Sequence, residues 1–165
     1  MKLNLREIIE IPNGSVPFER DLDGEELLFG SLVGFASVPH ASGRVFNEAG
    51  ILRLEGELTA ELLCVCDRCG KEFQSAKTMP LSAVIVEKNS TNAEDPELFF
   101  LEGDEIDLDE IISTLFILDM DMKFLCSEDC KGLCPRCGKD LNLGPCGCGK
   151  EIDPRFAVLE QLLDK

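Results

Sequence analysis

The sequence contains no tryptophan, no tyrosine and a single histidine, His40. With one histidine, the sequence gives little support for a catalytic Ser/His/Asp triad or a catalytic Cys/His pair. A zinc nucleobase deaminase would require H-x-E followed later by P-C-x-x-C. Here Ala41 and Ser42 follow His40, and Leu133 precedes Cys134. Walker and dinucleotide-binding glycine loops are also absent, so we expect a protein that is not an enzyme.

Basic residues are scarce, with 16 Lys and Arg against 32 Asp and Glu, which gives a formal net charge of -16. Such a surface repels bare nucleic acid unless a local basic patch overrides the field. Residues 89–122 carry eleven carboxylates and no Lys or Arg. This acidic run is either a solvated surface or an attachment face for a basic partner, such as a ribosomal protein or an assembly factor.

Long apolar runs are also missing. Charged residues interrupt the first ten positions, so we expect neither a secretory signal nor a membrane span. Nine cysteines, an odd number, fit metal ligation in a reducing cytosol better than a disulfide framework. We therefore expect a cytoplasmic protein.

Six of the nine cysteines lie in the short stretch 126–148, among glycines and prolines that leave too little apolar material for a core. Bound zinc would order this stretch. The sequence Cys134-Pro-Arg-Cys137-Gly138 has the form of a zinc knuckle, in which two intervening residues let both sulfurs reach one ion. We expect four of the following six cysteines to hold zinc: Cys126, Cys130, Cys134, Cys137, Cys146 and Cys148.

The pattern C-x-R-C-G-K occurs twice, from Cys66 and from Cys134. Two such knuckles could each supply half of one site, as in a zinc ribbon, so Cys66 and Cys69 are further possible ligands. We expect one ion, with two as the alternative. Another interpretation makes Cys64, Cys66 and Cys69 a redox or zinc-sensing switch. Cys64, however, is expected to pack in the core as a small apolar residue.

The cysteine-rich stretch is less acidic than the rest of the chain. Residues 123–150 carry five basic and three acidic side chains, and a zinc ion with four thiolates adds about -2. If the two knuckles lie together, their basic residues would meet a phosphate, which makes a direct RNA-binding zinc ribbon the alternative function. The candidate residues are Arg68, Lys71, Arg136 and Lys139.

Apolar or small residues occupy alternate positions from Leu52 to Cys64, which predicts a long half-buried strand. A second strand over residues 71–86 would complete an antiparallel hairpin with the first knuckle at its tip. Pro80 in that strand indicates an edge position or a bulge. Residues 32–38 predict another strand, and His40 is expected to lie in a turn, solvated rather than bound to metal.

Asp107 and Glu110 match a capping box, which predicts a helix over about Leu108–Leu118. Near the carboxyl end, Asp153 and Pro154 predict the start of a terminal helix. We expect an α+β fold with an antiparallel sheet and a few helices. Its expected parts are an antiparallel α+β core (1–122), a cysteine-rich zinc module (123–150) and a C-terminal helix packed on the core (151–165).

These motifs together resemble the YceD family, the large ribosomal RNA subunit accumulation proteins. The resemblance is carried by Cys66-Asp-Arg-Cys69 at the end of a long strand and by Cys-Lys-Gly-Leu-Cys-Pro-Arg-Cys-Gly within 130–138. The trailing Cys146-Gly-Cys148 and the closing segment 152–159 add to it. The family's more common central form has Leu where this chain has Gly70.

The resemblance implies a cytoplasmic protein needed for synthesis, processing or stability of the large-subunit ribosomal RNA. It brings no catalytic residues. The function expected is therefore that of a non-enzymatic factor in ribosome biogenesis that works through protein–protein contacts.

Overall fold

The computed structural model describes residues 1–87 and 98–148 of the 165-residue chain. The terminal helix expected after Asp153 lies outside the described residues. In the part of the chain that is described, no helix is long and apolar enough to cross a membrane.

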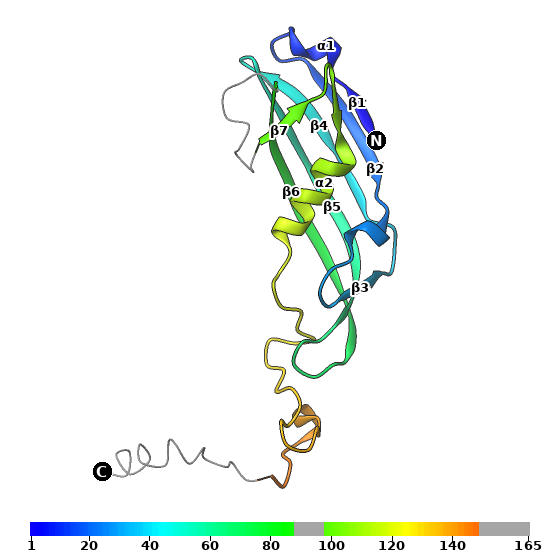
Figure 1. Ribbon diagram of the computed structural model, residues 1–165, viewed down its shortest axis with the longest axis vertical. Helices are drawn as coiled ribbons and strands as arrows, with labels where there is room; N and C mark the ends of the chain where they lie inside the picture. Colours follow the sequence, from blue (N-terminus) through cyan, green and yellow to red (C-terminus); the bar gives the residue numbers. More distant parts are fainter. Residues whose placement is uncertain (88–97, 149–165) are drawn as a thin grey trace, which may run out of the picture.

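A six-stranded sheet forms the body of the molecule (Figure 1). Five of its strands follow the order β2-β4-β5-β6-β7, and β3 pairs with β5 beyond the end of β4. The strands are β2 (Ser15–Asp21), β3 (Leu32–Phe35), β4 (His40–Glu48), β5 (Ile51–Val65), β6 (Glu72–Glu87) and β7 (Leu98–Leu101).

Shorter elements surround this sheet. A separate two-stranded ladder joins β1 and β8, which brings the start of the chain against the segment before α2. The bounds are β1 (Lys2–Asn4), α1 (Arg6–Ile9), the 3-10 helix η1 (Gly24–Leu27), β8 (Glu105–Asp107), α2 (Leu108–Asp119) and the 3-10 helix η2 (Leu141–Leu143).

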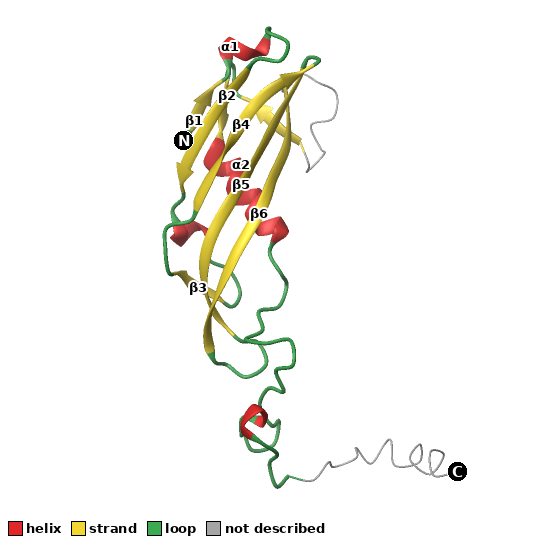
Figure 2. Cartoon of the chain, turned by 180° about the vertical axis from the view of Figure 1, so that it is seen from behind, coloured by secondary structure: helices red, strands yellow, loops and turns green. Residues whose placement is uncertain are grey.

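The β5–β6 hairpin is the longest feature, and it follows the predicted period of two. Its ladder runs from Leu52 paired with Ile85 to Val65 paired with Glu72. Apolar side chains at alternate positions of β5 are buried under α2, which crosses one face of the sheet (Figures 1 and 2). Pro80 lies where β6 has no second strand neighbour among the described residues, which agrees with an edge position.

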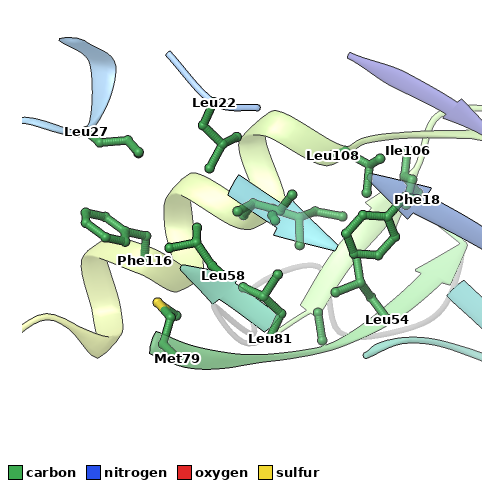
Figure 3. Packing of buried hydrophobic residues seen from close by; sticks show 14 of the residues in the cluster. Phe18, Leu22, Leu27, Leu54, Leu58, Met79, Leu81, Ile106, Leu108 and Phe116 are labelled. Carbon is green, nitrogen blue, oxygen red and sulfur yellow. The ribbon is translucent and has the colours of Figure 1, made fainter. Parts of the chain in front are cut away.

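The core lies between the sheet and α2 (Figure 3). Leu58 of β5 and Met79 of β6 lie beside Phe116 of α2. Leu81 of β6 lies beyond Leu58, and all four residues are at most 2% exposed. With no tryptophan or tyrosine in the chain, phenylalanines supply the aromatic contacts. Phe29 meets Phe116 edge to face with ring centroids 6.5 Å apart.

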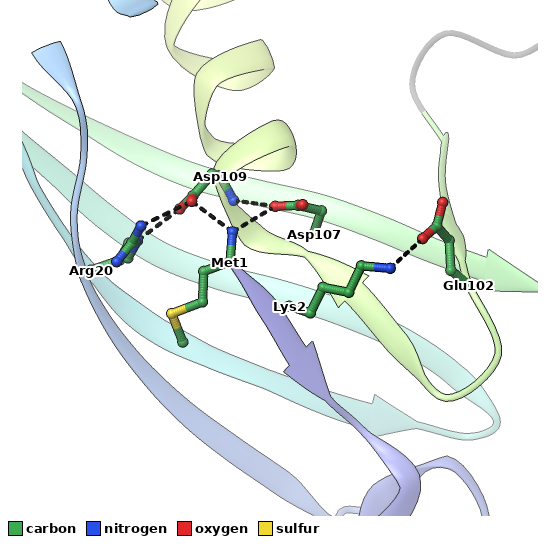
Figure 4. A network of polar contacts seen from close by, with 6 residues as sticks. All are labelled: Met1, Lys2, Arg20, Glu102, Asp107 and Asp109. Carbon is green, nitrogen blue, oxygen red and sulfur yellow. Dashed lines mark hydrogen bonds and ion pairs between the residues drawn. The ribbon is translucent and has the colours of Figure 1, made fainter.

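The predicted helix is present, and its start was correctly placed. The Asp107 side chain accepts a hydrogen bond from the backbone N–H of Asp109, which caps α2. Asp107 and Asp109 in turn bind the Met1 ammonium, at 3.0 and 2.6 Å, and Arg20 makes two hydrogen bonds to Asp109 (Figure 4). Arg20 lowers the pKa of Asp109. Part of the acidic run is therefore used to hold the N-terminal end of α2.

The sheet differs from the expected antiparallel arrangement at one edge. β7 runs parallel to β6, with Val84 opposite Leu98 and Glu87 opposite Leu101. The sequence 97–101 predicts a strand at this place, but the side-chain pattern carries no information about strand direction. The fold is sheet-rich and mixed rather than purely antiparallel.

The prediction of a turn at His40 is also wrong, because His40 is the first residue of β4. The small residues that suggested a turn serve a close strand contact instead, in which Gly43 of β4 lies opposite Gly56 of β5. A Cβ atom on Gly43 would lie 2.3 Å from the carbonyl oxygen of Glu55. The His40 side chain is half exposed and contacts a carboxylate oxygen of Asp21 at 2.7 Å, as befits a solvated residue.

We predict that Gly43→Val destabilises the sheet, because backbone atoms of β5 and the ring of Phe18 occupy the space that the new side chain needs. Overpacking of this kind costs about 1–3 kcal/mol. The free energy of unfolding in urea measures it. Gly34→Ala in β3 is the control, because its Cβ would meet only the Leu63 side chain at an ordinary 3.4 Å. Equal stability of both variants would contradict the close packing of β4 on β5.

Candidate metal centres

Eight of the nine cysteines gather in two groups of four. Within each group all four sulfur atoms lie within 4.8 Å of one another. The first group is formed by Cys66, Cys69, Cys126 and Cys130. The second group is formed by Cys134, Cys137, Cys146 and Cys148. Both lie at the hairpin-tip end of the elongated molecule (Figure 1).

The first group joins two parts of the chain that are far apart in sequence. Cys66 and Cys69 come from the tip of the β5–β6 hairpin, whereas Cys126 and Cys130 come from the segment after α2. The sulfurs of Cys66 and Cys130 are 3.7 Å apart, and those of Cys69 and Cys126 are also 3.7 Å apart. Cys66, Cys69 and Cys130 are buried, so the group is largely closed to solvent.

Asp67 connects this group to its surroundings. Its carboxylate accepts a hydrogen bond of 2.7 Å from the backbone N–H of Phe124 and another from the hydroxyl of Ser31. Its own N–H donates to the carbonyl of Phe124 at 2.9 Å. These bonds, the Ser31 contact first, lower the pKa of Asp67. Asp67 thus aligns the segment that carries Cys126 with the hairpin tip.

The second group is local in sequence. Cys134 and Cys146 have their sulfurs 3.3 Å apart. The 3-10 helix η2 lies between the two halves of the group, and Asp140 caps it by accepting the N–H of Asn142 at 2.8 Å. Lys139 donates to the carbonyl of Pro145 at 2.9 Å, which draws the returning chain toward the knuckle.

The two knuckles have the same backbone structure, as the repeated sequence suggests. The N–H of Gly70 donates to the carbonyl of Cys66 at 2.8 Å, and that of Gly138 to Cys134 at 2.9 Å. The φ angles of the two glycines are 70° and 71°, in the left-handed region that glycine adopts without strain. The motif therefore builds the same turn twice, once in each cysteine group.

The geometry of both groups fits a tetrahedral metal ion. A zinc–sulfur bond of about 2.3 Å implies sulfurs about 3.8 Å apart, whereas a disulfide holds them at about 2.05 Å. The observed separations of 3.3–3.7 Å match the first value more closely. All nine cysteines are free, so no disulfide competes for these sulfurs.

The pKa values within each group are spread apart. Burial would raise the pKa of Cys66, but backbone N–H groups, including that of Cys126, donate to its sulfur and lower the pKa to about 6. Backbone N–H donors lower the pKa of Cys134 to about 6 as well. Burial raises the pKa of Cys126 to about 12, and the neighbouring sulfur of Cys137 raises that of Cys148 to about 12. Four close sulfurs cannot all ionise unless a cation compensates their charge.

The two groups contact each other. The guanidinium of Arg68 in the first knuckle donates to the carbonyl of Cys130 at 2.9 Å, and the carbonyl of Arg68 accepts the N–H of Leu133 at 3.1 Å. Asn142 beside the second group donates to the sulfur of Cys130 at 3.5 Å and accepts the N–H of Lys131 at 2.7 Å. Hydrogen bonds therefore join the two groups.

The structure shows which of the predicted metal ligands lie together, a point that the sequence left open. Four of the six cysteines in the C-terminal stretch do lie together, while Cys126 and Cys130 join Cys66 and Cys69. The two knuckles do not share one site as in a zinc ribbon. The predicted domain boundary between residues 122 and 123 stays a prediction. The first group contains cysteines from both sides of this boundary.

Other candidate residues have structural contacts. Cys64 is fully buried in the hydrophobic core, as expected, and burial raises its pKa. Of the candidate RNA-binding residues, Arg68 and Lys139 both donate to main-chain carbonyls within the cysteine modules. Of the other two candidates, Lys71 belongs to the C-x-R-C-G-K motif of the first knuckle and Arg136 to that of the second.

Comparison with known protein families shows that both cysteine groups lie inside the part of the chain that one family model matches. The family model described as "Large ribosomal RNA subunit accumulation protein YceD" matches residues 54–163, about two thirds of the chain. This region includes all eight cysteines of the two groups. No solved structure matches the chain.

Several curated proteins are similar over much of the chain. An uncharacterized protein of Mycobacterium tuberculosis is 29% identical over 117 residues, which cover 69% of this chain and 56% of that protein. An uncharacterized protein of Mycobacterium leprae is 29% identical over 124 residues, covering 73% and 57% respectively. The chloroplastic "Large ribosomal RNA subunit accumulation protein YCED homolog 1" of Arabidopsis thaliana is 25% identical over 129 residues, covering 61% and 40%. The chain spans about half the length of the curated relatives it matches.

We predict that the purified protein carries two metal ions, one in each group. Native mass spectrometry under reducing conditions should show two ions in the wild type. The Cys134→Ser/Cys137→Ser variant should retain the ion of the first group and lose the other. The Cys66→Ser/Cys69→Ser variant should lose at least the ion of the first group. Cys64→Ala is the control, because it removes a thiol outside both groups and should keep two ions. A wild type with no ion, or with one ion lost in either double variant, would contradict two separate sites.

Proposed function

The chain belongs to the YceD family, and from that premise we propose that it is a non-enzymatic factor supporting synthesis, processing or stability of the large-subunit ribosomal RNA. The printed names of the family and of the plant relative both refer to accumulation of this RNA. Two four-thiolate groups are the observation in the structure that supports a non-catalytic role. Such a site offers a metal no open coordination position, whereas a catalytic zinc keeps one for water or substrate.

We propose zinc as the ion in both groups. Four thiolates in tetrahedral arrangement favour zinc among the metals available to proteins, and zinc imposes no redox chemistry on them. Two ions, the alternative considered from the sequence, fit the two separate groups better than one. The ions would hold the hairpin tip, the segment after α2 and the second knuckle as one unit.

Contacts with a basic protein are the mode of action that the charge favours. The net charge of -16 repels nucleic acid and attracts basic ribosomal proteins or assembly factors. At the N-terminal end of α2, Glu26 and Glu110 lie with Asp107 and Asp109 around an open hollow. Met1 and Arg20 compensate the two aspartates, whereas no ion pair is observed for Glu26 or Glu110 in the described structure. A reducing cytoplasm, proposed as the location, suits nine free thiols.

Direct RNA binding is less well supported than protein contact. Arg68 and Lys139, two of its four candidate residues, have donors bound to main-chain carbonyls. A thiol redox switch is also less well supported, because Cys66 and Cys69 are half of a four-sulfur group and Cys64 is buried in the core.

We predict that deleting the gene lowers the ratio of large-subunit to small-subunit ribosomal RNA, measured by quantitative electrophoresis of total RNA. The wild-type protein and Cys64→Ala should restore the ratio. Cys66→Ser/Cys69→Ser should not, because the hairpin tip would lose its attachment to the segment after α2. An unchanged ratio in the deletion strain would rule out the proposed function.

We further predict that the purified zinc-loaded protein does not bind ribosomal RNA fragments specifically at physiological salt. Filter binding between 50 and 200 mM salt measures this. A protein that makes 6–10 phosphate contacts loses about 10³–10⁵ in affinity over that range. Tight binding with such a steep slope, abolished by Arg136→Glu/Lys139→Glu, would support the RNA-binding alternative instead.

A further inference from the structure

An open groove of about 530 Å³ lies beside the hairpin, between two short segments of the N-terminal half. One wall consists of residues 22–25 with Leu28, on and around η1. The other wall consists of residues 33–39, from β3 into the loop before β4. Residues 32–38 are predicted from the sequence as a strand, but no sequence motif marks either segment as a binding site.

Hydrogen bonds fix the groove at both ends. At one end the N–H of Leu22 donates to the carbonyl of Pro39 at 2.9 Å. At the other end the N–H of Leu32 donates to the carbonyl of Phe29 at 3.0 Å. The two walls are therefore held at a set distance by main-chain bonds that do not depend on a ligand.

The base of the groove rests on the core. The ring of Phe35 packs against Phe116 of α2, with ring centroids 6.1 Å apart. Gly24 lies so close to the Phe35 ring that a Cβ atom there would be 2.8 Å from it. The groove therefore has a rigid apolar base rather than a collapsible one.

Large apolar side chains are exposed along the groove. Leu28 is 42% exposed, Val33 is 54% exposed and Val38 is 63% exposed. They lie together on one surface with no described side chain covering them. Clustered apolar exposure of this kind marks interaction sites more often than scattered single residues do.

The charged residues that line the groove itself are both acidic. Asp23 and Glu25 line the groove, and none of the described lining residues is Lys or Arg. The Asp23 carboxylate is held in place, since it accepts the N–H of Glu25 at 2.9 Å to cap η1. The groove thus combines an apolar base with a fixed acidic rim.

We propose that this groove is a docking site for an extended segment of a basic protein, one with an apolar side chain flanked by Lys or Arg. The apolar side chain would cover Val33 and Val38, while the cations would meet Asp23 and Glu25. This proposal rests on the proposed function, in which the partner is a basic protein of ribosome assembly. An extended partner suits β3, which pairs with β5 alone among the described residues.

The groove is connected to the first cysteine group. Ser31, next to β3, donates to the carboxylate of Asp67 between Cys66 and Cys69, and its carbonyl accepts the N–H of Val65 at 2.8 Å. One wall of the groove is therefore anchored to the knuckle. A metal that orders the knuckle would also order the docking site.

The test uses the full, metal-loaded chain and a set of overlapping 15-residue peptides that cover the large-subunit ribosomal proteins of the same organism. Fluorescence polarisation should identify peptides that bind and that contain an apolar residue flanked by Lys or Arg. Replacing those Lys and Arg residues with Glu should abolish binding. If no peptide binds, or if the binders lack basic residues, the proposal is overturned.

Two pairs of matched variants locate the site on the protein. Val33→Asp/Val38→Asp should weaken peptide binding at least tenfold, whereas Leu118→Asp/Leu143→Asp, which adds the same charge at exposed residues elsewhere, should not. Glu25→Lys should also weaken binding, and Glu57→Lys on β5 should leave it unchanged. Circular dichroism and metal content confirm folding. Equal losses in test and control variants would overturn the proposal.

Complementation separates this proposal from the proposed function. If the deletion strain has a lowered ratio of large-subunit to small-subunit RNA and the Val33→Asp/Val38→Asp variant restores this ratio fully, the groove proposal fails while the proposed function stands. If the deletion strain has a normal RNA ratio, the function fails, and peptide binding at the groove is then judged on the polarisation result alone.

Discussion

The contact between the hairpin tip and the segment after α2 is the constraint on which the cysteine-rich end of the molecule depends. It is made by four sulfur atoms, with Asp67 and Arg68 binding backbone groups beside them. The hydrophobic core reaches this region only as far as Phe124. Beyond that point few apolar side chains are available for burial. The zinc ion proposed for this group would order such a stretch, since metal binding supplies folding free energy directly.

The second cysteine group is in contact with the first. Leu133 and Asn142 attach the second knuckle to groups that the first holds in place. The same first group anchors Ser31 and so one wall of the apolar groove. Structural zinc sites contribute about 10–16 kcal/mol of apparent binding free energy near neutral pH, comparable with the whole stability of a small domain. Loss of one of the proposed zinc ions would thus affect surfaces well away from the sulfurs.

A ribosome-assembly factor that works by contact needs a surface of defined shape and charge rather than a reactive group. This chain offers an acidic surface, an apolar groove with acidic residues on its rim, and closed cysteine sites. The acidic residues have divided roles, because Asp107 and Asp109 also hold Met1 and Arg20 at the start of α2. The acidic run therefore has a structural role at the start of α2, beside the partner contact proposed for it.

Local pattern determined much of this protein. Alternation over β5, the cap of α2 at Asp107 and the two knuckle turns follow from neighbouring residues, because each depends on backbone preferences within a few positions. Tertiary structure decided the rest. The pairing of Cys66 and Cys69 with Cys126 and Cys130, the parallel direction of β7 and the groove at β3 depend on segments that approach only when the sheet forms. A knuckle specifies half of a four-cysteine group, and for the first knuckle only the fold brings the other half to it.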